Sequence, residues 1–239
     1  MADDRRPTGA VPVDQWWANA YRIGLEGLAT HVSPLPRLCP RGGESALGRF
    51  RQTTTGAPKG FNMTIKIRPA AVGDAPLLSR LGAATFRDTF EGENTPDDMA
   101  RYLAEAFTPE RQAAEITDPA GIVLLAEHHG ESGAAELVGY AHLVAGVAPQ
   151  AVQGPAPLEL KRLYVARQWH GRRVAQALMD AAIEAARARG TQTIWLGVWE
   201  RNPRAVAFYV KYGFVRVGEQ TFALGGDAQT DWLFARPVA

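Results

Sequence analysis

The stretch LELKRLYVARQWHGRRVAQALMDAAIEAARARG, residues 158–190, decides the fold. Its first eight residues (158–165) have the β-branched and aromatic content of a strand. A basic turn with one glycine follows, and residues 175–190 then space their apolar side chains at helical intervals. A second strand (193–199) and a second helix (202–214) come next. The pattern predicts a βαβ unit with a basic first turn.

The basic turn indicates a phosphate site. A helix start offers an anion several backbone N–H groups and about half a unit of positive dipole charge. Arg172 and Arg173 add two cationic side chains at the same place. We therefore expect a phosphorylated ligand to lie against this turn.

Two sequence blocks carry a resemblance to a known family. The block HGRRVA (170–175) resembles the Q/R-x-x-G-x-G/A loop with which the Gcn5-related N-acetyltransferases (GNAT) bind acetyl-CoA. It departs from that pattern twice, since His170 replaces Gln/Arg and Arg173 replaces the middle Gly. The second block matches the family's N-x-x-A-x-x-F-Y-x-x-x-G-F pattern at every position, with Asn202, Ala205, Phe208, Tyr209, Gly213 and Phe214.

The resemblance implies an α/β protein of the GNAT fold over residues 63–239, with a mixed twisted central sheet and helices on both faces. It implies acetyl-CoA as the co-substrate and direct attack of a primary amine on the acetyl group. Further segments, ELKRLYV, LGVWERNPRA and TFRDTF…NTPDDMARYLAEAF, are similar to bacterial spermidine/spermine-type N-acetyltransferases. A polyamine is the first choice of acceptor. Peptide, protein or small drug-like amines stay open, as does a non-catalytic sensor that binds acetyl-CoA.

The resemblance also assigns residues to the cofactor. Backbone groups of the strand would hold the pantetheine arm, those of the turn would hold the pyrophosphate, and Asn202 would bind the pantetheine region or simply cap its helix. The expected cofactor-binding residues are Leu163, Tyr164, Val165, His170, Gly171, Arg172, Arg173, Val174, Ala175, Asn202 and Tyr209.

Two residues are expected to move protons. Tyr209 matches the family's general acid, and a phenol of pKa about 10 can donate to a departing thiolate. The expected general base is Glu159, which stands where histone-type members carry a glutamate. Glu200 is an alternative base. If Glu159 is not catalytic, it is expected to form a structural salt bridge with Lys161 or Arg162. Members acting on protein α-amines carry a Glu where this chain has Gly197. A glycine inside a strand indicates close approach of another group.

Composition narrows the remaining choices. The 239 residues carry a net charge of +1, which gives no general attraction to nucleic acid or membranes. The single Cys39 excludes an internal disulfide framework and a Cys-based zinc cluster, and fits a reducing cytoplasm. We expect a cytoplasmic enzyme with a small-molecule amine substrate and without metal, nucleic-acid or membrane partners. A homodimer stays open.

The rest of the chain supplies the remaining elements. Residues 1–62 are expected to be a poorly structured extension. A strand opens at 64, and Asp74 is expected to cap the helix after it.

Residues 88–118 should form a loop and one helix, with nine Asp/Glu against two Arg. This acidic excess is either a solvated surface or an acidic lip that concentrates an amine substrate. Residues 121–130 and 137–146 should pair as a hairpin, and 215–224 and 230–238 should be strands.

Overall fold

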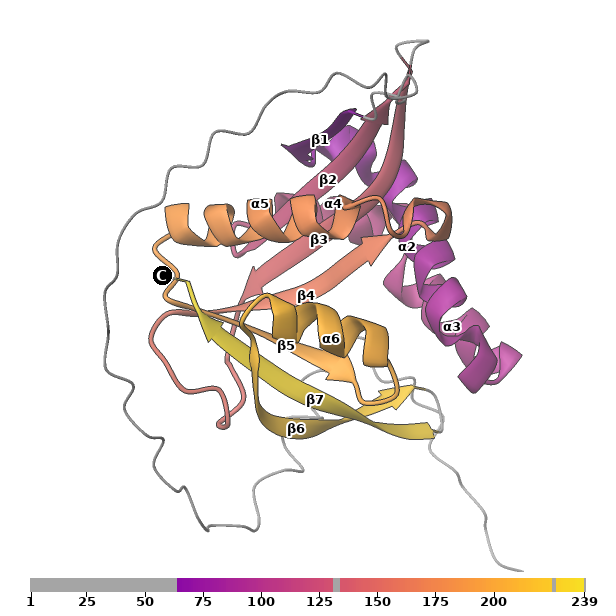
Figure 1. Cartoon of the computed structure of the whole chain (residues 1–239). Helices are drawn as coiled ribbons and strands as arrows, with labels where there is room; N and C mark the ends of the chain where they lie inside the picture. The colour runs from indigo at the N-terminus through magenta and orange to yellow at the C-terminus, as the bar shows by residue number, and fades with distance from the viewer. Residues whose placement is uncertain (1–63, 131–133, 225–226, 239) are drawn as a thin grey trace, which may run out of the picture.

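The computed structural model describes residues 64–130, 134–224 and 227–238, and the predicted extension 1–62 lies outside them. The described residues form a seven-stranded sheet in the order β1-β2-β3-β4-β5-β7-β6 (Figure 1). Its strands are β1 (Thr64–Pro69), β2 (Gly121–His129), β3 (Ala135–Ala145), β4 (Pro157–Val165), β5 (Thr193–Trp199), β6 (Val215–Leu224) and β7 (Asp227–Pro237). The helices are α2 (Ala75–Phe90), α3 (Pro96–Ala106), α4 (Pro109–Thr117), α5 (Val174–Ala188) and α6 (Pro203–Lys211). Short 3₁₀ turns cover Val72–Asp74, Glu91–Glu93 and Arg167–Trp169.

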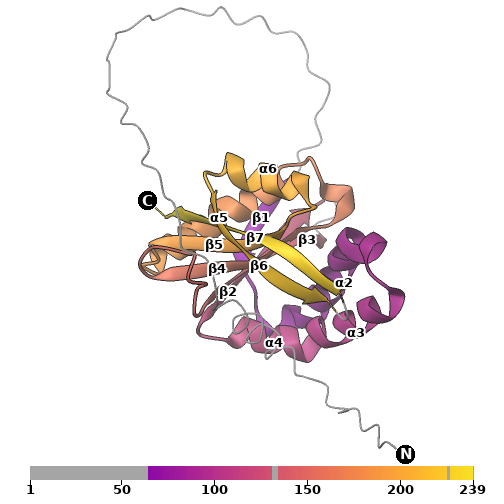
Figure 2. The same cartoon turned by 90° about the horizontal axis from the view of Figure 1, so that it is seen from below.

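Helices cover both faces of the sheet. Helices α5 and α6 lie on one face, and α2, α3 and α4 lie on the other (Figure 2). The sheet is mixed, because β4 and β5 are parallel whereas the other paired strands are antiparallel. The predicted fold class is confirmed. None of the helices in the described ranges is both long and apolar enough to cross a membrane.

The largest hydrophobic core lies under α5. This helix buries Val174, Leu178, Met179, Ala182 and Ala186, the apolar face that its helical spacing predicts. Opposite them the sheet contributes buried aliphatic residues of β2, β3, β4 and β5. The basic turn that precedes α5 is thus held against a rigid support.

Three helices begin with the same local signal, a capping side chain followed by proline. Thr95, Thr108 and Asn202 each accept a hydrogen bond from the backbone N–H three residues on, and the next residue is proline in all three. Residues 88–118 therefore hold two helices, α3 and α4, and the expectation of one helix there was wrong.

The start of α2 also differs from the prediction. Asp74 occupies the N-cap position, but its side chain makes no capping bond to α2. The carboxylate instead accepts from the Ala71 backbone N–H at 2.7 Å and pairs with Arg68 at 2.7 Å. The carboxylate thus ties β1 to the start of the helical layer.

The sheet parts between its two parallel strands. Residues Pro157–Glu159 of β4 pair with Thr193–Trp195 of β5, and no register is seen between these strands beyond that point. Farther on, β4 stays beside β3 and β5 stays beside β7. The second half of β4 therefore offers unpaired backbone groups to whatever lies in the gap.

A β-bulge in β4 decides which side chains face the α2 side. In the β3–β4 register, Arg162 is opposite His142 and Leu160 is opposite Leu143, so Lys161 is an extra residue. Lys161 and Arg162 both contact Glu115 of α4, although successive residues of a regular strand point to opposite faces. The bulge places two consecutive cations on one face.

Candidate active site

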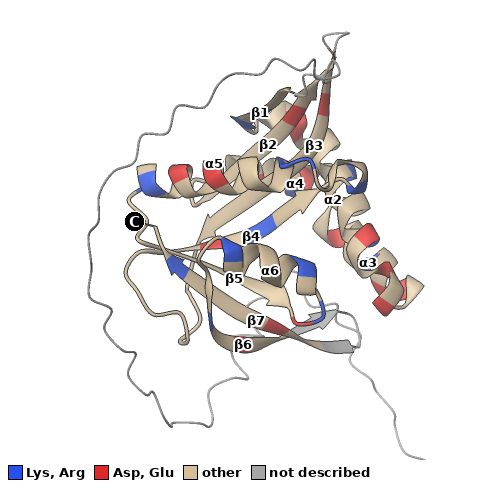
Figure 3. Ribbon diagram, in the orientation of Figure 1, with Lys and Arg blue, Asp and Glu red and all other residues tan. Residues whose placement is uncertain are grey.

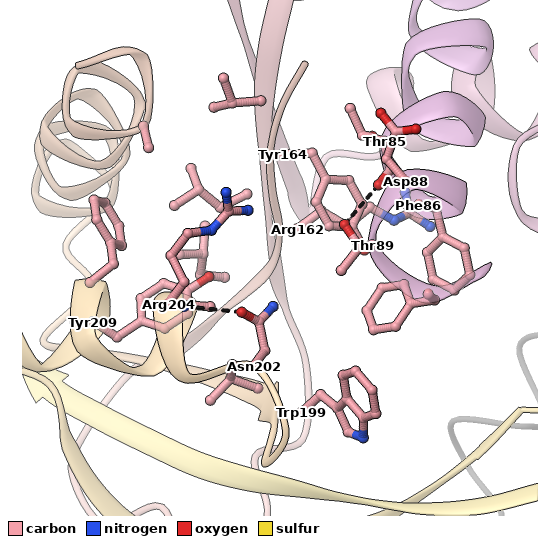
Figure 4. Close-up of a pocket in the computed structure, with 18 of the residues that line it drawn as sticks. Thr85, Phe86, Asp88, Thr89, Arg162, Tyr164, Trp199, Asn202, Arg204 and Tyr209 are labelled. Carbon is pink, nitrogen blue, oxygen red and sulfur yellow. Dashed lines mark hydrogen bonds between the residues drawn. The ribbon is translucent and has the colours of Figure 1, made fainter. Parts of the chain in front are cut away.

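A cavity of about 700 Å³ occupies the gap between β4 and β5. Figure 4 shows its two walls: Tyr209, Arg204 and Asn202 from the start of α6 on one side, and Thr85, Phe86, Asp88 and Thr89 from α2 on the other. Tyr164 and Arg162 of β4 lie between them. The cavity therefore passes through the sheet from one helical layer to the other.

Most of the residues predicted for the site line this cavity. These are Glu159, Leu163, Tyr164, Val165, His170, Gly171, Arg173, Val174, Ala175, Asn202 and Tyr209. Two predicted residues do not: the guanidinium of Arg172 lies over the Trp169 ring at 5.1 Å, and Glu200 is outside the lining.

The turn before α5 has an unusual backbone. Gly171 has φ 77° and Arg173 has φ 62°, both in the left-handed region. Glycine adopts that region without penalty and arginine does not, which explains why the family pattern has glycine where this chain has Arg173. The conformation lets α5 begin abruptly at Val174, so its first N–H groups have no partner within the helix.

His170 connects the end of β4 to α6. Its Nε2–H donates to the carbonyl oxygen of Val165 at 2.9 Å, and its Nδ1 accepts from Arg204 Nη1 at 2.8 Å. These roles require the neutral tautomer with the proton on Nε2. Arg204, which the sequence reasoning missed, is thereby fixed at the mouth of the cavity beside the basic turn.

Tyr209 lies in α6, and Asn202 is the N-cap of that helix. The ring of Tyr209 packs against Phe208 and Phe214, with centroids 5.6 and 5.8 Å apart. Burial raises the pKa of the Tyr209 phenol above its usual value, so the hydroxyl stays protonated. Asn202 Oδ1 accepts from the Ala205 N–H at 3.1 Å, as the capping alternative predicted, and the residue also lines the cavity.

Glu159 lies where the two strands begin to part, opposite Trp195. Burial raises the pKa of its carboxyl to about 7, against the opposing charges of Lys161 and Arg162. Among the described residues no side chain forms an ion pair or hydrogen bond with Glu159. The alternative to a catalytic role was a salt bridge to Lys161 or Arg162, but both of these residues contact Glu115 instead.

A second carboxylate, Asp231 of β7, also lines the cavity and was not predicted. It is paired with Trp199 across β5 and β7, and burial raises its pKa to about 7. Gln220 and Gln229 lie in the same part of the cavity. Only the pairing of β7 with β5 brings Asp231 to the site, and no local pattern marks it.

Aromatic rings line the side of the cavity nearest α2. Phe86, Phe90, Tyr102 and Trp199 all contribute, and the Phe90 and Trp199 rings are 5.8 Å apart. Trp195 is instead buried in a separate core cluster. Figure 3 shows acidic residues along α3 and basic residues in the turn before α5. Of the acidic residues in 88–118, Asp88 is the one that lines the cavity.

Comparison with known proteins identifies the family. Residues 85–214 match the acetyltransferase (GNAT) family. The chain belongs to this family. An uncharacterised N-acetyltransferase of Lactobacillus delbrueckii subsp. lactis is 32% identical over 174 residues, which cover 73% of this chain and 98% of the relative. One from Mycobacterium tuberculosis is 33% identical over 165 residues, covering 69% and 98%. The protein is therefore an N-acetyltransferase of the GNAT family.

Solved structures share its GNAT fold. The PaiA N-acetyltransferase of Thermoplasma acidophilum in complex with coenzyme A superposes with a TM-score of 0.58 at 20% identity, over 73% of this chain and 99% of that one. A Salmonella typhimurium acetyltransferase with acetyl-CoA gives a TM-score of 0.52 at 19% identity, over 74% and 95%.

Proposed function

We propose that this enzyme transfers the acetyl group of acetyl-CoA to a primary amine, with a polyamine as the first candidate. The observation that supports this most strongly is the cavity itself. It begins at a basic turn with unpaired N–H groups, passes the unpaired half of β4, and ends among carboxylates and aromatic rings. One end suits a phosphorylated cofactor and the other a cationic amine.

The cofactor half fits a pyrophosphate and a pantetheine arm. The free N–H groups at the start of α5 suit an anion, and a side chain at 171 would stand in the open approach to them. Arg173 and Arg204, which both line the cavity, supply the charge. Backbone groups of Leu163, Tyr164 and Val165 would pair with the amide groups of the arm across the gap.

The chemistry needs one proton removed and one supplied. A reacting amine arrives as an ammonium ion and must lose a proton before it attacks. Glu159, with its pKa near 7, can accept that proton at neutral pH. Tyr209 keeps its proton and can give it to the departing sulfur. Acetyl-CoA supplies the activated acyl group.

The acceptor half favours a cationic amine. Lys161 and Arg162 both contact Glu115, and Arg201 pairs with the exposed Glu93 at 3.5 Å. The carboxylates of Glu159, Asp231 and Asp88 line the cavity without a cation of this kind against them in the described part of the chain, and aromatic faces attract ammonium groups. A polyamine, which carries several ammonium groups on an apolar chain, matches both features.

A panel assay tests the proposal. The purified enzyme is mixed with acetyl-CoA and spermidine, putrescine, a peptide amine or a drug-like amine, and free thiol is followed. We expect release with polyamines. Tyr209→Phe should lower the maximal rate by about 10²–10⁴-fold if loss of the thiolate limits turnover. Glu159→Gln should slow the reaction most at low pH, where the amine is mostly protonated.

The same assay decides between the alternatives. Turnover with peptide amines alone would replace the polyamine assignment. Tight acetyl-CoA binding with no turnover on any of these amines would refute the polyamine assignment. Identical pH–rate profiles in the wild type and both variants would remove the proton-transfer roles of Tyr209 and Glu159.

A further inference from the structure

Asp231 occupies a recess that a glycine creates. A Cβ atom built on Gly197 would lie 3.2 Å from Asp231 Oδ2 and 3.0 Å from Gln220 Nε2. Both distances are tighter than ordinary carbon contacts. The absence of a side chain at 197 therefore lets the carboxylate and the amide lean over β5 into the cavity.

No side chain that the structure describes supplies the recess with a cation. Within the described residues, no ion pair or hydrogen bond to the Asp231 carboxylate is seen, and burial alone raises its pKa to about 7. Trp199, its partner across the strands, and Phe90 provide aromatic walls nearby. A half-buried carboxylate with no ion-pair partner among the described side chains loses part of its hydration, and a bound cation would offset this loss.

Asp231 and Glu159 lie at two separate places along the same cavity. Glu159 is level with Trp195 of β5, and Asp231 is level with Trp199 on the opposite side of that strand. Four residues of strand span about 13 Å. Asp231 leans back toward Gly197, so we place the two carboxylates on the order of 10 Å apart. One ammonium ion cannot contact both, whereas two ammonium groups joined by a flexible chain can.

We propose that Asp231, flanked by Gln220, binds a second ammonium group of the acceptor, so that the enzyme prefers linear diamines and polyamines over monoamines. This inference rests on the proposed function, in which Glu159 serves the reacting nitrogen. Asp231 is then a specificity residue that holds the far end of the substrate and positions the near end at the thioester.

Matched pairs of amines test the proposal. The probes are putrescine against n-butylamine and cadaverine against n-pentylamine, because each pair differs by one terminal ammonium group. Asp231→Asn keeps the shape of the side chain and removes its charge. We expect KM for the diamines to rise about 10- to 100-fold, as for a lost charge-assisted hydrogen bond, with kcat/KM for the monoamines nearly unchanged.

Asp97→Asn is the control. It makes the same charge change on an exposed residue of α3 that does not line the cavity. If long-range attraction alone caused the preference, both variants would lower it equally, and the proposal would fail. In the wild type, the preference for the diamine should also grow as pH rises through about 7, where Asp231 ionises, and this growth should be missing in Asp231→Asn.

Two other outcomes would overturn the assignment. If Asp231→Asn lowers kcat/KM equally for the diamine and the monoamine of each pair, Asp231 serves the reacting amine. If kcat/KM falls for neither amine, Asp231 has no role in substrate binding. If the wild type acetylates none of the probes, the proposed function fails separately. Calorimetric titration with putrescine then tests whether Asp231 binds an ammonium group. Binding that is lost in Asp231→Asn supports this role. No binding to the wild type, or equal binding to the variant, refutes it.

Discussion

The buried Glu115 and the half-buried pair Glu159 and Asp231 lie on the same side of the sheet in opposite electrostatic surroundings. Glu115 of α4 contacts Arg162, Lys161 at 3.8 Å, Arg111 at 3.5 Å and His142 at 3.7 Å. Burial acts to raise its pKa, but the surrounding charges, that of Arg162 foremost, hold it below the usual value. Glu159 and Asp231 form no ion pair with any side chain that the structure describes, and burial raises their pKa values to about 7.

The difference in ion pairing distinguishes a carboxylate that supports the fold, Glu115, from one that lines the cavity, Glu159. Lys161 and Arg162 follow Glu159 closely in β4, yet both contact Glu115 across the interface with α4 because the bulge turns them together. The same interaction that joins α4 to the sheet therefore directs both cations to Glu115, and Glu159 has no direct ion pair within the described part of the chain. A buried charge that is matched supports the fold, and one left unmatched is available to a ligand.

Removing Glu115, the carboxylate that is paired with cations, should have the largest effect on the free energy of unfolding. Glu115→Ala leaves Arg162 and Lys161 without their carboxylate, and removing one partner of a buried pair typically destabilises a protein by about 3–5 kcal/mol. Urea denaturation measures the change. Glu184→Ala, which removes an exposed carboxylate that pairs with Arg187, should change stability by less than about 1 kcal/mol. Equal losses in the two variants would contradict the comparison.

Neutralising the unmatched group should act in the opposite direction. The folded pKa of Glu159 lies above its unfolded value of 4.5, so the folded state loses stability as pH rises from about 4.5 through about 7. Glu159→Gln should therefore stabilise the ligand-free protein at about pH 8 by roughly 2–3 kcal/mol and have little effect near pH 4. Asp231→Asn should shift stability in the same direction.

Thermal denaturation across pH checks this second prediction. Glu110→Gln, a change at an exposed acid in the first turn of α4, supplies the control and should not stabilise the protein at pH 8. A wild type and Glu159→Gln that melt alike at pH 8 would show that the carboxylate has a partner after all.

The basic turn extends the comparison to the backbone. Gly171→Val should weaken acetyl-CoA binding tenfold or more, about 1.4 kcal/mol for each factor of ten. Gly190→Val is the matched control, because Gly190 has φ 79° and equally open surroundings but follows the far end of α5. Both changes should lower stability by similar amounts, and only the first should alter the calorimetric affinity for acetyl-CoA. An equal affinity change would remove the phosphate assignment.

Arg173 should show the smallest effect. Arg173→Gly relieves a left-handed backbone and should stabilise the protein by about 1 kcal/mol or less. If the arginine also attracts the phosphates, the variant should bind acetyl-CoA more weakly, and more so at low salt than at high salt. A variant that gains stability and keeps its affinity at all salt concentrations would show that glycine serves equally well here.

Local signals in the sequence were enough to predict which residues line the proposed cofactor half of the cavity. The turn at 170–175 and the block from Asn202 to Phe214 are contiguous, and their residues are neighbours in space because they are neighbours in the chain. Thr108-Pro109 carried the same helix-start signal as Thr95-Pro96 and could have revealed α4. The polar, acidic composition around it obscured the apolar period of that helix.

The acceptor half could not be read in the same way. Asp231 stands in a strand of ordinary composition and reaches Gly197 only through the β5–β7 pairing. The bulge at Lys161 depends on the register with β3, and Arg204 matters because His170 contacts it across the gap. Each of these features depends on a contact between segments far apart in sequence. Local sequence propensities carry no information about such contacts.

The short seam between β4 and β5 leaves few ladder hydrogen bonds at the centre of the sheet. Three residue pairs join its two halves there, whereas the ladders on either side are longer. A ligand arm lying in the gap would bridge the unpaired edges and stiffen the joint. We therefore expect deuterium to enter the backbone amides at the ends of β4 and β5 quickly in the free protein and slowly when acetyl-CoA is bound. Acetyl-CoA would then act as the missing strand that completes the sheet.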